Sequence, residues 1–223
     1  MEEYLVKVKS VKKITRDVLQ IVTEKPKGYT FIPGQATSIS LNKFGWRKTD
    51  NPFTFTSLPE DDFLEFTIKT YPLHKGLTHE LLRLESSDEL MVHEAFGTIS
   101  YKGEGTFIAG GAGVTPFISI LRFLQSKNKI GANRLIFANK TSNDIILREE
   151  FERILGARFV NILSSEQTTQ YSYGHITQDF LLANCRSPKS YFYVCGPPPM
   201  MDAVEKLLLT MHVDEALIVK EVF

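Results

Sequence analysis

A glycine-rich turn at residues 107–117, with the sequence FIAGGAGVTPF, has the clearest chemical potential in the chain. Glycines let a backbone approach a bulky anion, and the free N–H groups of a helix's first turn point at such a ligand. Pro116 suits that first turn, because its missing N–H would have no partner inside the helix. The pattern predicts a diphosphate site. Its residues are Gly110, Gly111, Gly113, Val114, Thr115 and Pro116.

The same turn also fits a tight strand-to-helix connection that binds nothing. The dinucleotide pattern G-x-G-x-x-G does not occur in it, and no Gly-Lys-Ser/Thr follows as in a P-loop. The choice between a ligand site and a plain turn therefore depends on the rest of the chain.

A second motif, YVCGPPPMM at residues 193–201, ends a later predicted strand and begins a helix. The carboxyl ends of parallel strands meet at the ligand-binding edge of an open sheet, so this motif should face the same crevice as the glycine-rich turn. By residue type, Cys195 also fits a small buried hydrophobic position. The candidate binding residues of this motif are Cys195, Gly196, Pro197 and Met200.

The elements that position these motifs are of two kinds. Up to Tyr101, short runs alternate apolar and polar residues between turn residues, which is typical of a small antiparallel barrel or sandwich. Leucines at helical spacing after Gly76 predict one short helix between two strands. The strands predicted in this part span residues 4–14, 18–23, 36–41, 53–57, 63–70 and 89–92.

After Tyr101, apolar strands alternate with amphipathic helices, as in a parallel sheet covered on both faces. The predicted strands span residues 106–109, 135–139, 159–163, 191–195 and 218–222. The predicted helices span residues 116–125, 147–155, 176–183 and 200–211. The predicted fold is therefore an antiparallel β-barrel domain at residues 1–101, followed by a doubly wound α/β domain with a parallel sheet at residues 102–223.

Composition argues against several classes of protein. Lys+Arg and Asp+Glu both number 26, so no net charge recruits nucleic acid or an anionic membrane. The 2 cysteines and 5 histidines lack the spacings of common metal sites, and we predict no metal. The start of the chain does not read as a signal peptide, and no apolar run is long enough to span a membrane. We expect a soluble, cytoplasmic protein.

Together, the two motifs in this order behind a barrel resemble the ferredoxin-NADP reductase superfamily, and more closely its compact flavodoxin-reductase-like members. The resemblance covers essentially the whole chain. It implies that the barrel binds a flavin, that the second domain binds NAD(P)H, and that hydride passes between the domains. It also implies that the glycine-rich turn holds the nicotinamide-nucleotide phosphates and that Cys195, Gly196 and Pro197 lie beside the reactive nicotinamide carbon.

The family's flavin signature is Arg-x-Tyr-Ser/Thr on a barrel strand, and this chain has Asn51, Pro52, Phe53 and Thr54 in that place. The resemblance implies a hydroxyl contact from Thr54 near flavin N5 and an aromatic contact from Phe53. Asn51 brings no charge and no bidentate fork to a flavin diphosphate, so we expect weaker FAD binding, or FMN as a competitor. The alternative is an ordinary barrel strand with core aromatic residues at Phe53 and Phe55.

A further family element places a glycine and a hydroxyl residue at a helix N-terminus, where backbone N–H groups contact the flavin diphosphate. Lys75, Gly76, Leu77 and Thr78 match this element. Lys75 would then supply charge that Asn51 lacks. Otherwise Lys75 is a solvated turn residue.

The chain ends in Glu221, Val222 and Phe223, which is similar to the acidic-x-aromatic ending of plant-type ferredoxin reductases. The resemblance implies that the Phe223 ring covers the flavin where nicotinamide must stack, and that it moves aside for hydride transfer. Glu221 would exchange protons through Thr54, or instead cap a sheet edge.

The loop after the third parallel strand, LSSEQ at residues 163–167, stands where NADP-preferring relatives usually have Ser-Arg-Glu. Ser164 can hydrogen-bond a 2′-phosphate, but Ser165 brings no guanidinium to pair with its charge. The resemblance slightly favours NADPH, and NADH stays open. The further candidates for contacts in this region are Lys140, Arg158 and Tyr173.

The predicted function is a flavin-dependent NAD(P)H oxidoreductase. It would pass hydride from nicotinamide to FAD and then electrons to a protein acceptor such as flavodoxin or ferredoxin. Two enzymatic alternatives are the reductase component of an oxygenase and a free-flavin reductase. A non-enzymatic alternative is a nucleotide-sensing regulatory module without bound flavin.

Overall fold

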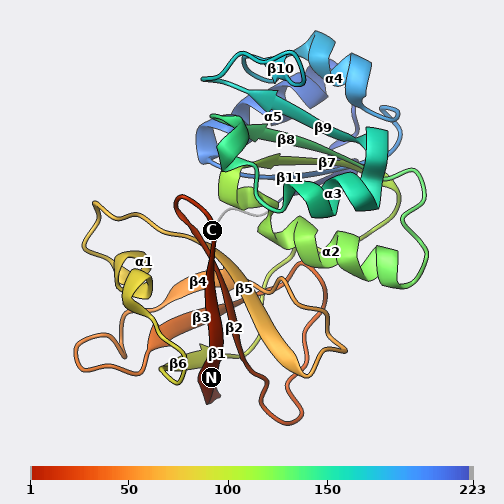
Figure 1. Cartoon of the computed structure of the whole chain (residues 1–223). Coiled ribbons are helices and arrows are strands. Elements are labelled where there is room, and N and C mark those ends of the chain that lie inside the picture. The colour runs from red at the N-terminus through yellow and green to blue at the C-terminus, as the bar shows by residue number, and fades with distance from the viewer. Residues whose placement is uncertain (1, 221–223) are drawn as a thin grey trace.

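Two six-stranded sheets organise the chain, the first antiparallel and the second parallel (Figure 1). The computed structural model describes residues 2–220. The order of the two sheets along the sequence confirms the predicted fold class, with the exception that the first sheet curls like a barrel without closing. Within residues 2–220, no helix has the length and apolar character that a membrane span requires.

The antiparallel sheet, called the barrel sheet below, agrees with five of the six predicted strands to within about two residues. Its strands are β1 (Glu3–Thr15), β2 (Val18–Glu24), β3 (Ala36–Leu41), β4 (Asn51–Thr54), β5 (Phe63–Lys69) and β6 (Glu89–His93). They lie in the order β4-β3-β6-β1-β2-β5. Alternate side chains such as Val6, Val8 and Ile21 are buried inside the curl, because strand residues alternate between the two faces of a sheet.

Strand β4 is the exception, since it ends at Thr54 and does not continue through residue 57. Up to Thr54 it pairs with β3. The chain then changes neighbours: the Phe55 N–H donates to the Gln35 carbonyl at 3.0 Å, and the Thr56 N–H donates to the Glu65 carbonyl of β5 at 2.7 Å. The alternation of apolar and polar residues continues across this corner, so the pattern could not show where the partner changes.

The leucine pattern after Gly76 forms a short helix between two strands, as predicted. Helix α1 (Leu77–Glu80) is followed at once by a 3₁₀ turn at Leu81–Arg83. Leu77 and Leu81 are buried in the core of the barrel sheet, which accounts for the apolar spacing.

The parallel sheet has the order β10-β9-β8-β7-β11-β12. Its strands are β7 (Gly105–Gly110), β8 (Arg134–Asn139), β9 (Phe159–Leu163), β10 (Ser172–Tyr173), β11 (Tyr191–Cys195) and β12 (Ile218–Lys220). The five predicted strands are confirmed as far as residue 220. Strand β10 was not predicted, because its two residues are exposed and carry no hydrophobic pattern.

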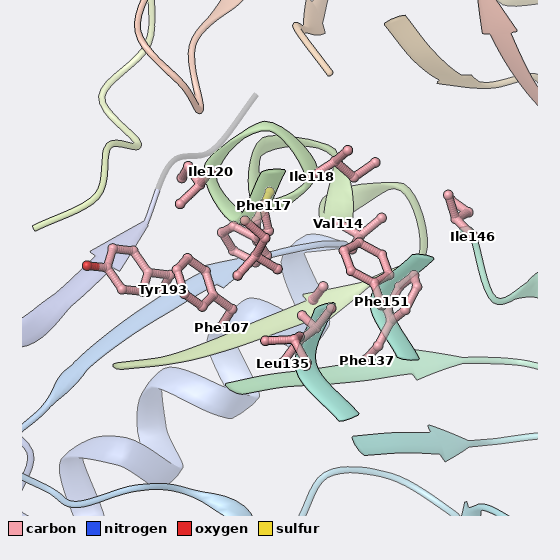
Figure 2. Close-up of a cluster of buried hydrophobic side chains, with 14 of the residues drawn as sticks. Phe107, Val114, Phe117, Ile118, Ile120, Leu135, Phe137, Ile146, Phe151 and Tyr193 are labelled. Atoms are coloured by element: carbon pink, nitrogen blue, oxygen red, sulfur yellow. The ribbon is translucent and has the colours of Figure 1, made fainter. Parts of the chain in front are cut away.

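Helices cover both faces of the parallel sheet, as predicted. They are α2 (Thr115–Ser126), α3 (Arg148–Leu155), α4 (Gln178–Asn184) and α5 (Pro198–Thr210). Helices α2 and α3 pack on one face, where Phe117 and Phe151 contact a buried cluster that includes Phe107, Phe137 and Tyr193 (Figure 2). Helices α4 and α5 cover the other face through a separate apolar cluster.

Helix α2 of the parallel half lies against the barrel sheet (Figure 1). Val18 and Ile99, from the first half of the chain, belong to the same hydrophobic cluster as α2. The glycine-rich turn, which leads into α2, is therefore held next to the barrel sheet.

Candidate functional site

The glycine-rich turn begins where β7 ends. Residues Gly111–Val114 form a 3₁₀ helix, and α2 follows from Thr115. Within the described residues no side chain caps either helix start, so no side chain competes with a ligand for the first-turn N–H groups. Gly111 has φ +52°, and a Cβ there would meet nothing within 4 Å. Donors beside open space fit the diphosphate of a nicotinamide nucleotide.

The two motifs pack directly against each other, as their predicted places on one sheet edge require. A Cβ on Gly113 would lie 2.3 Å from the Cys195 carbonyl oxygen. A Cβ on Gly110 would lie 2.5 Å from Met200 Sδ, and one on Gly196 would lie 2.8 Å from Met200 Cε. Gly113 is needed for the close approach of the two turns, because its Cβ would meet backbone, whereas Gly110 and Gly196 make room for the Met200 side chain. The sequence pattern does not separate this packing role from ligand binding.

Helix α5 starts two residues earlier than predicted, and its start offers few donors. Pro198 and Pro199 open the helix without N–H groups. The N–H groups of Met200 and Met201 both donate to the Pro197 carbonyl, at 2.9 and 3.1 Å. A diphosphate is therefore better matched to the glycine-rich turn than to α5. Cys195 is buried just below the exposed Pro197, at the end of β11.

Thr54 and Thr115 meet between the two halves of the chain. Thr54 ends β4 and is buried, and Thr115 begins α2. The Thr115 hydroxyl donates to the Thr54 hydroxyl at 3.3 Å. Thr54 was proposed for the flavin and Thr115 for the nicotinamide nucleotide, so the structure brings residues of both predicted sites together.

The other residues of the flavin signature lie along β4. Asn51 and Pro52 are exposed, and Phe53 is half-buried against the core of the barrel sheet. Phe55 is fully buried and stacks on Phe31 with ring centroids 4.2 Å apart, so it is a core residue. Asn51 and Phe53 keep accessible surface for a ligand.

The element at Lys75 to Thr78 also keeps accessible surface. Gly76 is the N-cap of α1, and within the described residues no side chain caps this helix. Lys75 is exposed, Thr78 is half-buried, and Leu77 points into the core. The arrangement fits backbone donors beside a cation, with α1 only 4 residues long.

The loop after β9 is tied to the loop after β8. The Ser164 N–H donates to the Asn139 carbonyl and the Ser165 N–H to the Lys140 carbonyl, both at 2.9 Å. Tyr173 pairs in register with Leu163 and so lies at the same edge.

Arg158 does not lie at this edge. It precedes β9 and donates to the carbonyls of Leu155 and Gly131. Because it sits at the amino end of the strand, Arg158 is removed from the candidates for a 2′-phosphate contact.

Glu166 is a residue that the sequence analysis did not single out. Its carboxylate accepts from the Ser142 N–H at 2.5 Å and from the Ser142 hydroxyl at 3.1 Å. These bonds hold an acidic group next to Ser165, the position at which NADP-preferring relatives usually have an arginine. The signal was present in the sequence as the acidic residue after Ser164 and Ser165.

Helix α2 carries two further residues that the sequence analysis missed. The Ser119 hydroxyl accepts from the Gly34 N–H at 2.9 Å, and Arg122 donates to the Thr56 carbonyl at 2.7 Å. Together with Thr115 they occupy positions i, i+4 and i+7, which lie on one face of a helix. That spacing of polar residues on an otherwise apolar helix was a readable signal.

The proposed gate residue Phe223 and the proposed proton-exchange residue Glu221 lie outside the described residues. Their roles stay predictions.

Two domain families match the chain. The family described as an FAD-binding domain matches residues 3–128, which is more than half of the chain. The family described as an oxidoreductase NAD-binding domain matches residues 107–206. The second match contains both the glycine-rich turn and the YVCGPPPMM motif.

Among curated proteins, the chain is similar to NADH-cytochrome b5 reductase 2 of Mycosarcoma maydis, with 27% identity over 88% of this chain and 62% of that protein. It is also similar to the reductase component of propane 2-monooxygenase of Rhodococcus jostii, with 26% identity over 93% of this chain and 60% of that protein. The chain thus spans about three fifths of the length of these relatives.

Solved structures share the fold. A ferredoxin NADP+ reductase from Neisseria gonorrhoeae with bound FAD and NADP has a TM-score of 0.85 at 20% identity, covering 99% of this chain and 98% of that one. The cytochrome b5 reductase domain of Ulva prolifera nitrate reductase has a TM-score of 0.84 at 22% identity, covering 99% and 97%.

Proposed function

Because the chain belongs to the ferredoxin-NADP reductase superfamily, we propose that it is a flavoenzyme that transfers electrons from NAD(P)H through FAD to a separate protein acceptor. The observation that carries this proposal is the hydrogen bond between Thr115 and Thr54, at 3.3 Å. It joins the start of the nicotinamide-nucleotide helix to the end of the flavin strand. We assign residues 1–101 to the flavin-binding domain and 102–223 to the nicotinamide-binding domain.

When bound, the two cofactors supply hydride transfer and the later release of single electrons. The protein's task is to align the two rings and exclude water. We assign the Thr54 hydroxyl to the reacting edge of the flavin, because it is buried and faces Thr115. We assign Cys195 and Gly196 to the binding position of the nicotinamide ring, since they pack on the glycine-rich turn.

The flavin diphosphate needs positive charge that Asn51 does not bring. We assign this charge to Lys75, which is exposed beside the uncapped start of α1. If Lys75 has this role, Lys75→Ala lowers FAD affinity and reduces its dependence on salt. Unchanged affinity and salt dependence would remove Lys75 from the site.

For the nicotinamide nucleotide, we propose NADH rather than NADPH. Ser165 stands where NADP-preferring relatives usually have an arginine, so this loop offers no guanidinium to pair with the charge of a 2′-phosphate, and the neighbouring Glu166 carboxylate is already held by Ser142. Ser165 is exposed in the same loop and is uncharged. Relatives named as NADH-dependent reductases support the same preference.

The acceptor is proposed to be a one-electron carrier protein. Flavodoxin and ferredoxin, the carriers expected from the sequence, compete with a cytochrome b5 and with an oxygenase component, which the names of the relatives suggest. Separate assays with each purified carrier, at equal concentration and with NADH as donor, would rank them.

The first experiment is an anaerobic titration of the FAD-loaded protein with NADH and then NADPH, followed by visible absorption. Bleaching of the flavin band at stoichiometric NADH supports the proposal and reports the nucleotide preference. Retention of no flavin, or a flavin that neither nucleotide reduces, would contradict it and favour the flavin-free sensing module.

A further inference from the structure

Arg122 is the charged residue of α2, and its side chain contacts the barrel sheet. Its Nη1 donates to the Thr56 carbonyl at 2.7 Å and to Glu65 Oε1 at 2.6 Å. Its Nε and Nη2 donate to the two oxygens of Glu150 on α3, at 2.6 and 2.9 Å. One guanidinium therefore joins the barrel sheet, α2 and α3.

This cluster is shielded from solvent and well satisfied. The side chains of Arg122 and Glu150 are each 19% exposed, and that of Glu65 is 10% exposed. Glu65 also accepts from Thr56 Oγ1 at 2.8 Å and from Gln20 Nε2 at 2.9 Å. Burial lowers the pKa of the Arg122 guanidinium, but its bonds to Glu150 and the charge of Glu65 raise the pKa overall, so the group stays charged.

The cluster lies close to both threonines of the proposed site, Thr54 and Thr115. Thr56 follows Thr54 by two residues, and Arg122 follows Thr115 by two helical turns. Ser119, one turn after Thr115, is fully buried and accepts from the Gly34 N–H. A shift of α2 along the barrel sheet would therefore break the Arg122 contacts and the contact between Thr115 and Thr54 together.

We propose that Arg122 is a positioning residue for hydride transfer, because its fork on Glu65 and Glu150 sets where α2 presents Thr115 to Thr54. The proposal rests on the proposed function and deepens it. Arginine is suited to this role, since its planar fork fixes a direction that the flexible lysine ammonium does not. Misplacement by about 1 Å can cost on the order of 100-fold in rate, so a small shift of α2 is sufficient.

Arg122→Lys keeps the charge and removes the fork. We expect the rate of flavin reduction at saturating NADH, measured by anaerobic stopped flow, to fall at least about 10-fold. The Kd for NADH should change less than about 3-fold, since the donors of the glycine-rich turn shift together with the start of α2. The second readout is hydrogen exchange of the Gly34 amide, measured by NMR on the FAD-loaded protein, which should accelerate at least about 10-fold as its bond to Ser119 loosens.

Lys127→Met is the matched control. Lys127 follows the last residue of α2 and forms an ion pair with Glu60 of the first half at 3.0 Å, but the two side chains are 46% and 55% exposed. Its loss should change neither readout, because an exposed pair contributes little. Glu65→Gln provides a second disruption of the cluster and should reproduce both effects of Arg122→Lys.

An unchanged reduction rate in folded Arg122→Lys overturns the inference, and so does a slower rate with unchanged Gly34 exchange. If the wild-type chain reduces no flavin, the proposed function fails. The exchange readout then still decides by itself whether Arg122 holds α2 on the barrel sheet.

Discussion

The hydroxyl of Thr115, at the start of helix α2, donates a hydrogen bond at 3.3 Å to the hydroxyl of Thr54, at the end of strand β4 of the barrel sheet. Each hydroxyl can both donate and accept a hydrogen bond. One threonine can therefore bond to a ligand while the two hydroxyls stay bonded to each other.

Thr54→Val and Thr115→Val keep the side-chain shape and remove one hydroxyl each. A neutral hydrogen bond contributes about 0.5–1.5 kcal/mol, so each variant should reduce flavin about 3- to 10-fold more slowly, with Thr54→Val the slower. The double variant should show a coupling of about 1 kcal/mol in a double-mutant cycle. Thr177→Val, at the N-cap of α4 on the other side of the sheet, is the control. Additive effects would mean that the two hydroxyls act independently.

Gly113→Ala places a Cβ 2.3 Å from the Cys195 carbonyl oxygen, so backbone must move. We expect a stability loss of about 1–3 kcal/mol in urea unfolding and at least about 10-fold weaker nicotinamide binding. Gly156→Ala is a control in which the cost has a different cause, since Gly156 has φ +55° with nothing within 4 Å of the added Cβ, and it lies at the end of α3. It should cost about 1–3 kcal/mol through backbone strain and leave nicotinamide binding intact. Equal binding losses in both variants would refute a specific role for the packed turns.

Tyr193 links β11 to the segment between the two sheets. Its hydroxyl accepts from the N–H groups of Lys102 and Gly103, at 2.9 and 3.0 Å, and donates to the Gly103 carbonyl at 2.7 Å. Tyr193→Phe leaves these backbone groups without their hydrogen-bond partner and should lower the free energy of unfolding by about 1–3 kcal/mol. Tyr191→Phe, whose hydroxyl makes no hydrogen bond within residues 2–220, is the matched control.

The same residue predicts a dependence on alkaline pH. Burial raises the pKa of Tyr193 to about 12, against 10.0 for the unfolded chain. The stabilisation is complete below pH 10 and is lost as pH rises through 12, because only the unfolded phenol releases its proton in that window. The stability difference between wild type and Tyr193→Phe should therefore shrink between pH 10 and pH 12. A constant difference would show that the phenol titrates normally.

Nucleotide preference should respond to the loop after β9. Ser165→Arg adds a guanidinium and keeps the Glu166 carboxylate that Ser142 holds, so the loop then has the Ser-Arg-Glu sequence of NADP-preferring relatives. The ratio of kcat/KM for NADH to that for NADPH should fall at least about 10-fold, since a guanidinium–phosphate pair is strong and directional. Ser187→Arg, before β11 at the opposite edge of the sheet, should leave the ratio unchanged. An unchanged ratio of the two kcat/KM values would mean that the loop after β9 does not contact the 2′-position of the nucleotide.

Much of the fold could be predicted from the sequence, because alternation and helical spacing report which face of each element is buried. The strands β3, β9 and β11 were placed to the residue for this reason. The corner after Thr54 was not, since Phe55 is as apolar as a strand residue and only changes its partner. The two-residue β10 carried no pattern at all.

The sequence by itself determined the class of the protein and the two motifs at one sheet edge, since residue type and spacing within a segment carry that information. Only the tertiary structure decided which groups from distant segments meet. In the folded chain, Thr115 contacts Thr54, and Arg122 forms ion pairs with Glu65 and Glu150. Gly113 packs against Cys195, whereas Gly111 faces open space. These contacts depend on how α2 docks on the barrel sheet, and docking is set by shape and charge across the interface, which no single segment contains.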